Sequence, residues 1–139
     1  MMPVGTVRLT LPDGREIENP TAAQLGDLIL SKDQKYWEYQ SGDVGLRFEG
    51  PQDDAEMILI LKEPHGIFIQ HIGVNDWDEY CAVGPDTDGG IVVAYVGGEP
   101  RRLPRRHLLP RAVALRVVEE FCRSGARSND VAWAPSPGV

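Results

Sequence analysis

The sequence contains little that would place the protein in a membrane or in an oxidising compartment. No apolar run approaches the roughly 20 residues of a transmembrane helix, and the first residues lack the basic start and apolar stretch of a secretory signal. The two cysteines, Cys81 and Cys122, fall on an expected strand and on the apolar face of an expected helix. Their spacing is compatible with a disulfide, but these settings favour two reduced thiols. We therefore expect a cytoplasmic protein without a membrane partner.

Patterns that support metal binding or catalysis are also scarce. No two of the histidines His65, His71 and His107 are spaced as on one helix face or in a zinc finger, and neither cysteine lies in a Cys-x-x-Cys pair. We interpret each histidine as a surface or turn residue, because no neighbour in the sequence would tune its pKa. The sequence thus predicts no catalytic residue, no metal and no cofactor, although these absences alone do not exclude an enzyme.

Two glycine-rich segments resemble ligand-binding loops only in part. Asp86-Thr-Asp-Gly-Gly90 begins like a calcium loop, but its glycine comes too early and the glutamate at the twelfth position is missing. Gly97-Gly98 is followed by glutamate and proline, whereas a phosphate-binding loop ends in Gly-Lys-Ser/Thr. We interpret both segments as connecting turns.

The amino-acid composition is that of one globular domain. The chain has 139 residues, of which 42% are hydrophobic and 7% aromatic, and this is enough to form a single core. No linker or internal repeat divides it. We expect one α+β domain over residues 1–134 and a flexible tail over residues 135–139, because Pro and Gly dominate that tail.

Alternating apolar residues predict a strand-rich fold. Val7, Leu9 and Leu11 alternate with polar residues before a Pro-Asp-Gly turn, which predicts a hairpin returning through residues 15–17. Thr21 and Gln24 have the spacing of a capping box at the start of a short helix. Further strands are expected at residues 36–40, 44–48, 56–61, 67–72, 77–83 and 91–96, with 101–103 pairing back. The run at 56–61 is apolar throughout, as in a strand covered on both faces.

The last third of the chain predicts a long helix and a closing strand. Pro110 suits the start of a helix and Gly125 suits the left-handed residue that follows one. Val113, Val117 and Phe121 recur between them at helical spacing. Trp133, in the closing strand, is expected to be buried. Together the elements predict a curved antiparallel sheet, a meander of about six to eight strands, packed by two helices.

Charge is distributed unevenly along the sequence. Residues 1–100 carry 6 Lys+Arg and 18 Asp+Glu, a balance of −12, whereas residues 101–139 carry 8 and 3, a balance of +5. Between Asp53 and Asp88, nine carboxylates are opposed only by Lys62. Such a field repels nucleic acid and attracts a basic protein. The alternative interpretation is a solvated acidic surface that keeps the protein soluble.

Two segments are candidates for contact with a partner. Trp77 stands among acidic and polar residues, so it is either a core residue at the start of a strand or an interface anchor with an acidic rim. The arginines of residues 101–106 are numerous enough to contact phosphates, but interleaved aromatic residues are missing. We expect these arginines to complement carboxylates of the protein or of a partner, while Leu103, Leu108 and Leu109 anchor the segment in the core.

The C-terminal pattern resembles immunity proteins of bacterial polymorphic toxin systems. The residues that carry the resemblance are the helix after Pro110, its end at Glu119-Glu-Phe-Cys-Arg-Ser-Gly125, and the strand Val131-Ala-Trp133. The family most similar is the first-numbered one of that series (Imm1-like), in which a strand and a loop such as Ile91–Val96 and Gly97-Gly98-Glu99-Pro100 precede the final helix.

This resemblance implies a cytoplasmic protein, encoded beside a toxin, that binds the toxin domain and blocks it. Toxins associated with the family are often nucleases or nucleic-acid deaminases, whose substrate grooves are basic. The family offers no catalytic residue to transfer, so the predicted contacts with a basic toxin domain follow from charge and expected exposure alone. The predicted partner-binding residues are Asp76, Trp77, Asp78, Glu79, Asp86 and Asp88, with Asp53 and Asp54 as a second group. The rival expectations are a small-molecule-binding domain and an accessory structural domain without catalysis.

Overall fold

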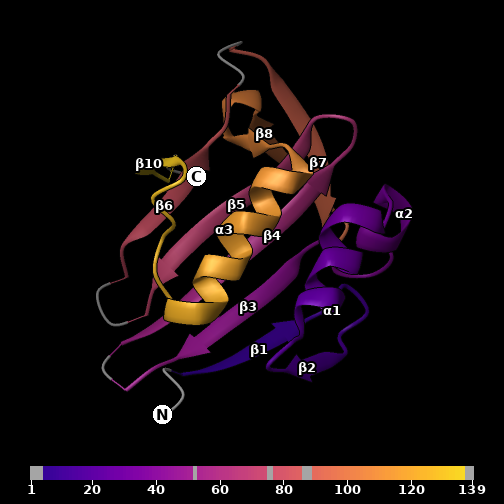
Figure 1. Cartoon of the computed structure of the whole chain (residues 1–139). Coiled ribbons are helices and arrows are strands. Elements are labelled where there is room, and N and C mark those ends of the chain that lie inside the picture. The colour runs from indigo at the N-terminus through magenta and orange to yellow at the C-terminus, as the bar shows by residue number, and fades with distance from the viewer. Residues whose placement is uncertain (1–4, 52, 75–76, 86–88, 137–139) are drawn as a thin grey trace.

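The computed structural model describes residues 5–51, 53–74, 77–85 and 89–136 (Figure 1). Its strands are β1 (Thr6–Thr10), β2 (Glu16–Glu18), β3 (Val44–Glu49), β4 (Asp54–Lys62), β5 (Gly66–Gly73), β6 (Glu79–Val83), β7 (Ile91–Val96), β8 (Glu99–Pro104), β9 (Leu108–Leu109) and β10 (Ala132–Pro135). Its helices are α1 (Ala22–Gly26), which continues as the π-helix η1 (Asp27–Ser31), α2 (Gln34–Trp37), the 3-10 helix η2 (Arg105–His107) and α3 (Arg111–Ser124).

Most of the strands form one open antiparallel sheet. They lie in the order β10-β6-β5-β4-β3-β1-β2, and β9 pairs with β5 beside β6. β3 to β6 follow one another as a meander, whereas β1 lies between β2 and β3. β7 and β8 form a separate two-stranded sheet. The predicted α+β class and antiparallel sheet are confirmed.

The N-terminal hairpin and helix form as their sequences predict. β1 pairs with β2, and Leu9 lies opposite Ile17. At the start of α1, the Thr21 hydroxyl accepts a hydrogen bond from the backbone N–H of Gln24, 3.1 Å away. The side-chain carbonyl of Gln24 accepts one from the N–H of Thr21 at 2.9 Å. This reciprocal capping box satisfies two N–H groups that the helix itself leaves without partners.

The strand predicted at residues 36–40 is wrong. Residues 34–37 form the short helix α2, because the Asp33 carboxylate accepts a hydrogen bond from the N–H of Tyr36 at 3.0 Å and caps the turn. Trp37 is fully buried and Tyr39 is 70% exposed. The aromatic residues two positions apart resemble the alternation of a strand, but the cap at Asp33 stabilises a helical turn instead.

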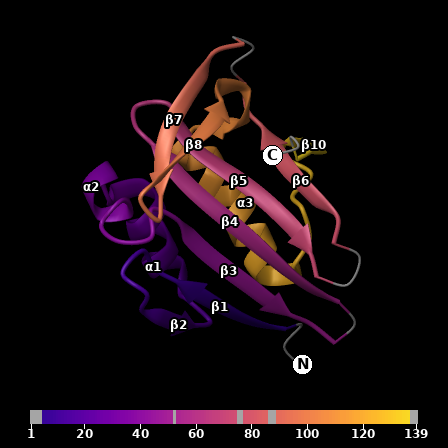
Figure 2. The ribbon, with the colours of Figure 1, turned by 180° about the vertical axis from the view of Figure 1, so that it is seen from behind.

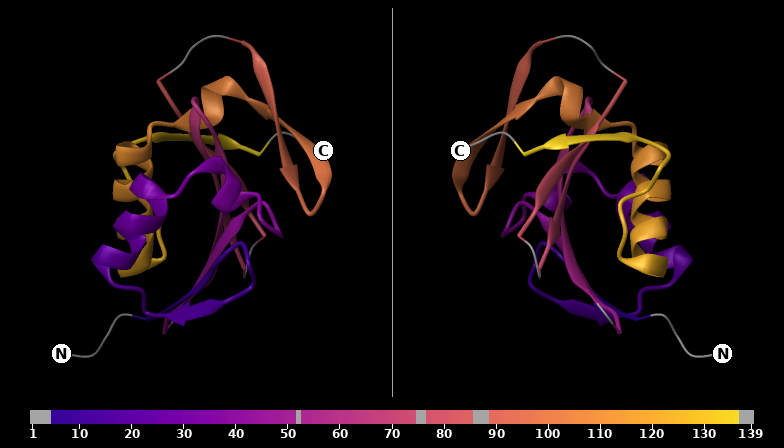
Figure 3. Two further views of the ribbon diagram at one scale, coloured as in Figure 1. Left: turned by 90° about the vertical axis from the view of Figure 1, so that its right-hand side faces the viewer. Right: turned by 90° about the vertical axis from the view of Figure 1, so that its left-hand side faces the viewer.

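The register of the ladders sorts residues onto two faces of the main sheet. Leu46 lies opposite Met57, and Met57 lies opposite His71. These residues belong to the inner face, which α1 and α3 cover (Figure 3). The next row along the strands, Arg47 opposite Glu56, projects from the outer face. A hydrophobic core therefore lies between the inner face and the helices.

α3 is the main element that closes this core. Val117, Val118 and Phe121 are fully buried, and the Phe121 ring lies edge-on to Phe48 with ring centroids 6.2 Å apart. The helix ends at Gly125, whose φ of 73° is left-handed and whose N–H donates to the Phe121 carbonyl at 2.7 Å. The predicted helix is confirmed, with its first turn beginning one residue after Pro110.

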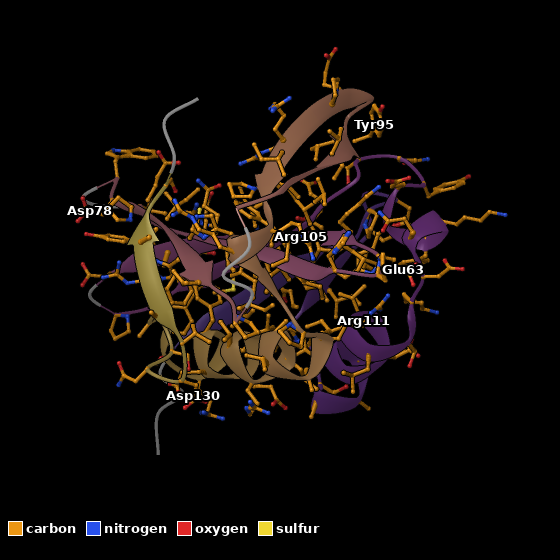
Figure 4. The ribbon with its side chains drawn as sticks, turned by 90° about the horizontal axis from the view of Figure 1, so that it is seen from above. Glu63, Asp78, Tyr95, Arg105, Arg111 and Asp130 are labelled. Carbon is orange, nitrogen blue, oxygen red and sulfur yellow. The ribbon has the colours of Figure 1, made fainter. Side chains whose placement is uncertain are left out.

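The N-terminal end of α3 is tied to two other elements. Arg111 donates to the backbone carbonyl of Lys32 at 2.7 Å, just beyond η1, and pairs with Glu63 at 3.3 Å (Figure 4). Glu63 also accepts a hydrogen bond from the N–H of Gln34 at 2.6 Å. Residues from α3, the β4–β5 turn and α2 thus share one polar contact, which fixes the helices over the sheet.

A second, smaller core lies on the outer face. The hairpin of β7 and β8 packs against β4 and β5, and buries Ala94 and Leu103 against Ile60 and Phe68 (Figure 2). β4 is therefore covered on both faces over part of its length, as its apolar run predicts. Leu108 and Leu109, predicted to anchor the arginine-rich segment, are buried as well.

Several single-residue predictions have different outcomes. Cys81 and Cys122 are free thiols, as expected. His71 and His107 are buried, so their interpretation as surface or turn residues is wrong. Trp133 is only partly buried at the edge of the inner core. Of the predicted tail, Pro135 belongs to β10, and residues 137–139 lie outside the described residues.

Candidate partner-binding surface

Two loops that are distant in the sequence meet at one end of the main sheet. β3 and β4 are connected through Asp53, and β5 and β6 through Trp77 and Asp78 (Figure 1). Ala55 lies opposite Gly73 in the ladder, and the N–H of Val74 donates to the carbonyl of Asp54 at 3.1 Å. This pairing places both connections at the same end of the sheet. We call the described residues there the acidic end: Asp53, Asp54, Trp77, Asp78 and Glu79.

Trp77 is the exposed aromatic residue of the acidic end. Its side chain is 72% exposed, so the interpretation of Trp77 as a core residue is wrong. Its backbone has a φ of 58°, in the left-handed region that a bulky residue rarely adopts. The N–H of Trp77 donates to the Gly73 carbonyl at 2.7 Å, and the Gly73 N–H donates to the Asp78 carbonyl at 3.0 Å. These two bonds fix the backbone at Trp77, whose large indole ring is exposed to solvent.

The carboxylates of this end continue onto the outer face of the sheet. Arg47 pairs with Glu56 at 2.6 Å and with Asp54 at 3.5 Å, so one arginine serves two carboxylates. In the ladder, Glu56 lies opposite Ile72 and Ile72 opposite Glu79. The outer face next to the acidic end therefore presents acidic groups around a half-buried isoleucine. An apolar centre with a charged rim is typical of protein-binding surfaces.

A surface depression separates the acidic end from the end of α3. It has a volume of about 270 Å³ and is lined by Asp53 and Asp54 on one side and by residues 124–126 on the other. His71 also lines it, and the Nε2 atom of His71 is 2.9 Å from the carbonyl oxygen of Gly125. Since a carbonyl only accepts, Nε2–H is the donor. The ring also lies edge-on to Phe121, so His71 acts as part of the core.

Not all of the predicted contact residues fall within the described structure. Asp76, Asp86 and Asp88 lie outside the described residues. Asp86 and Asp88 follow β6 and precede β7, and Val83, the last residue of β6, is at the other end of that strand from Glu79. Asp53, Asp54, Trp77, Asp78 and Glu79 therefore form one group, and Val83 lies away from it at the far end of β6.

The sequence alone does not identify Arg47, Glu56 and Ile72 as members of this surface. It places only Glu56 in part, because Glu56 begins the predicted strand at residues 56–61, and strand alternation sets it on the opposite face from Met57. The missing information was the register, which sets Arg47 beside Glu56 and Ile72 between two carboxylates. A charge count along the sequence cannot supply it.

Some buried polar groups of the described residues have structural partners, whereas Nε1 of Trp37 and Nε2 of His107 are buried without a hydrogen-bond partner. The Nδ1–H of His107 donates to the carbonyl of Ala82, 3.0 Å away, because a carbonyl oxygen can only accept. Burial raises the pKa of the Cys122 thiol to about 11 and also raises the pKa of Cys81, so both stay protonated at neutral pH. Within residues 5–136, apart from the gaps named above, no three His, Cys, Asp or Glu side chains are grouped to hold a metal ion.

Comparison with known proteins identifies the family of the chain. No helix in the described part of the chain is both long and apolar enough to cross a membrane. A search of curated proteins finds no match. The sequence model of the family described as immunity protein Imm1 matches residues 14–135, from the first hairpin to the last strand. Because this match covers most of the chain, the protein belongs to the immunity protein Imm1 family.

Proposed function

We propose that the protein binds a cognate toxin domain through the acidic end and thereby occludes the toxin's active site. Membership of an immunity family supports the general role. The observation that carries the proposed site is Trp77, which is 72% exposed in one of the two acidic loops that meet at this end of the sheet. Tryptophan is among the residues that contribute most to protein interfaces when a partner buries it. Its exposure is explained if a partner covers it.

Electrostatics supports a basic partner. The protein carries a formal charge of −7, and residues 1–100 account for −12 against +5 for the remainder. A nuclease or nucleic-acid deaminase binds phosphates with a basic groove, so an acidic protein competes for the same groups. Long-range attraction also raises the rate of association. The proposal therefore assigns inhibition to occlusion of such a groove, in the cytoplasm of the cell that carries both genes, without direct contact to nucleic acid.

No described feature favours the rival expectation of a small-molecule site. Three surface depressions in the described part of the chain are open and measure about 250, 270 and 440 Å³. Small-molecule sites generally enclose most of the ligand in an apolar cavity. The depression beside Asp53 and Asp54 is instead a hollow next to the acidic end, into which a side chain of the partner can insert.

The first test is growth rescue together with binding. The C-terminal domain encoded by the adjacent gene is co-expressed with this protein, and the two purified proteins are mixed at low salt. The proposal predicts restored growth and a one-to-one complex whose association slows as salt is added, because screening weakens the attraction between exposed charges. Growth arrest without complex formation would contradict the proposed function.

A second test locates the surface. Reversal of two charges at the acidic end, Asp78→Lys with Glu79→Lys, is expected to slow association by about tenfold or more. The matched control is Glu119→Lys with Glu120→Lys on α3, which changes the net charge equally on the other side of the sheet. Equal slowing in both variants would mean that only total charge matters, and would remove the acidic end as the binding surface.

A further inference from the structure

The hairpin of β7 and β8 has two exposed edges of different character. It forms its own two-stranded sheet and attaches to the main sheet only through one face, where Ala94 and Leu103 are buried. Figure 2 shows this hairpin on the side of the sheet opposite α3. In such a ribbon, the backbone N–H and C=O groups of alternate residues point away from the partner strand on both outer edges.

The prolines of β8 show which residues point outward. Pro100 lies opposite Tyr95 and Pro104 opposite Ile91, and a proline has no N–H to give to the ladder. Between them, Arg102 lies opposite Val93. These three pairs are therefore the ones without mutual hydrogen bonds.

A hydrogen bond just beyond the hairpin supports this assignment independently. The N–H of Arg105 donates to the carbonyl of Gly90 at 2.9 Å, so Gly90 and Arg105 are a bonded pair. Because bonded and non-bonded pairs alternate along an antiparallel ladder, the next pair, Ile91 with Pro104, is not bonded.

The two edges consequently differ in what they offer. On β8, only Arg102 has an N–H that points outward, because the other two outward positions are prolines. On β7, Ile91, Val93 and Tyr95 all have one. Proteins protect edge strands with prolines and charges, and β8 has both. β7 has the sequence Ile-Val-Val-Ala-Tyr-Val, with no charge and no proline. The residues of β7 therefore give its edge no such protection.

Two side chains of β7 are exposed beside these backbone groups. Ile91 is 49% exposed and Tyr95 is 51% exposed. They project on the side of the ribbon that faces away from the main sheet, since Val92 and Val96 pack toward it. An apolar surface thus lies beside backbone groups that can pair, and this combination fits an incoming strand whose alternate residues are apolar.

One end of the edge is closed by a loop. The N–H of Gly97 donates to the carbonyl of Ser41 at 2.7 Å. Gly42 lies so close to the Tyr95 carbonyl that a Cβ atom at this position would collide with it. The part of β7 that is open to pairing is therefore the stretch from Ile91 to Val93.

Net charge argues against a second copy of the protein as the occupant, because two copies that each carry −7 repel one another. Symmetric antiparallel pairing of two β7 strands about Val93 would also set Ile91 of one copy opposite Tyr95 of the other, where the loop at Ser41 and Gly42 lies. The loop leaves open only the shorter pairing about Val92, with Ile91 opposite Val93. A short strand from a protein of opposite charge meets neither restriction.

We propose that the edge of β7 from Ile91 to Val93 accepts an extended segment of the toxin domain as an added strand. This inference rests on the proposed function. It adds a second contact, since the hairpin lies on the same side of the sheet as Glu56 and Glu79, whereas α3 lies on the other (Figure 3). Asp78 and Tyr95 are well separated in Figure 4, so a partner that reaches both covers much of the outer face.

Hydrogen exchange tests the pairing directly in the wild-type proteins. The amides of Ile91 and Val93 are expected to exchange rapidly in the free protein and at least tenfold more slowly in the complex with the toxin domain, because pairing buries them. The amide of Arg102, on the other edge, is expected to exchange equally in both. A complex in which Ile91 and Val93 exchange as fast as in the free protein would overturn the inference.

Proline substitution supplies the matched pair of variants. Val93→Pro removes the outward N–H of β7, and Arg102→Pro removes the outward N–H of the residue directly opposite. Both prolines occupy outward positions like those of Pro100 and Pro104, which the hairpin already accommodates. We expect Val93→Pro to weaken the complex at least tenfold and Arg102→Pro to leave its affinity within twofold.

The outcomes separate this inference from the proposed function. If the wild-type protein binds the toxin domain and Val93→Pro binds equally well, the strand-pairing inference fails and the proposed function stands. If no complex forms with the wild-type protein, the proposed function itself fails. If the free protein is a dimer and Val93→Pro is a monomer, the occupant is a second copy, and the proposed partner is wrong.

Discussion

The two faces of the main sheet are formed by the same strands but differ in the side chains they present. The inner face presents apolar residues to α1 and α3, and the largest helix side chains of this core, Trp37 of α2 and Phe121 of α3, are fully buried. The outer face sets Arg47 and Glu56 in solvent and carries the hairpin of β7 and β8. The inner face therefore accounts for most of the stability of the fold, whereas we propose that the outer face with the acidic end provides recognition.

Truncation of the inner core should have the largest effect on stability. Phe121→Ala removes a ring that contacts Phe48 and His71 and is fully buried. We expect the free energy of unfolding to fall by about 3–5 kcal/mol, because a cavity remains where the ring was. Urea denaturation measures this change. A loss below about 1 kcal/mol would mean that the inner face does not dominate the stability of the fold.

A methyl group at the end of α3 should have the next largest effect. Gly125→Ala places a Cβ 2.5 Å from Cδ1 of Phe48 and keeps a φ of 73°. We expect a loss of about 2–3 kcal/mol from the clash and the left-handed backbone together. Gly98→Ala is the control, because its φ is also positive, at 81°, but its Cβ would meet nothing within 4 Å. The control should lose only about 1 kcal/mol.

The partly buried thiol of Cys122 in α3 predicts a pH dependence for the inner core. Burial, followed by the charge of Glu119, raises the pKa of Cys122 from 9.0 to about 11. Between these two values the folded protein keeps a proton that the unfolded chain loses, so the free energy of unfolding falls as the pH rises. The measurement is urea denaturation from pH 8 to 11 for the wild type and Cys122→Ala. The difference between the two should shrink or change sign with rising pH, and a constant difference would contradict the assignment.

The smallest effect is expected on the outer face. Arg47→Gln removes ion pairs to Glu56 and Asp54 that are open to solvent. Exposed ion pairs contribute about 1 kcal/mol or less, because solvent screens the charges and ordering the side chains costs entropy. Denaturation in urea should show a change of that size. A loss as large as that of Phe121→Ala would remove the distinction between the two faces.

The sequence predicts the inner face more completely than the outer one. α3 is predicted in full because Pro110 and Gly125 mark its ends and apolar residues recur between them at helical spacing. The first hairpin and the capping box at Thr21 follow equally from local patterns. The strand predicted at residues 36–40 is wrong because alternation over five residues is a weak signal, and the cap at Asp33 stabilises a helical turn there instead.

The candidate site depends on contacts that a sequence does not record. The sequence identifies the acidic loops by their charge and Trp77 by its acidic neighbours. Asp54 and Trp77 come together only because Ala55 pairs with Gly73 in the ladder. The same register gives Arg47 its two carboxylates. The unprotected edge of β7 likewise follows from which residues lie opposite the prolines of β8. Patterns along the chain thus predict elements, whereas proximity between elements has to be observed.

The most direct test of the account is the dissociation constant of the complex between the toxin domain and Trp77→Ala, with Tyr39→Ala as the control. Both side chains are exposed, 72% and 70% respectively, but Tyr39 lies beside α2, away from the acidic end. We expect Trp77→Ala to weaken binding by about 2 kcal/mol, which is about 30-fold in Kd, while its free energy of unfolding changes by less than about 1 kcal/mol. Tyr39→Ala should bind like the wild type. Wild-type affinity in Trp77→Ala would contradict the assignment of recognition to the acidic end.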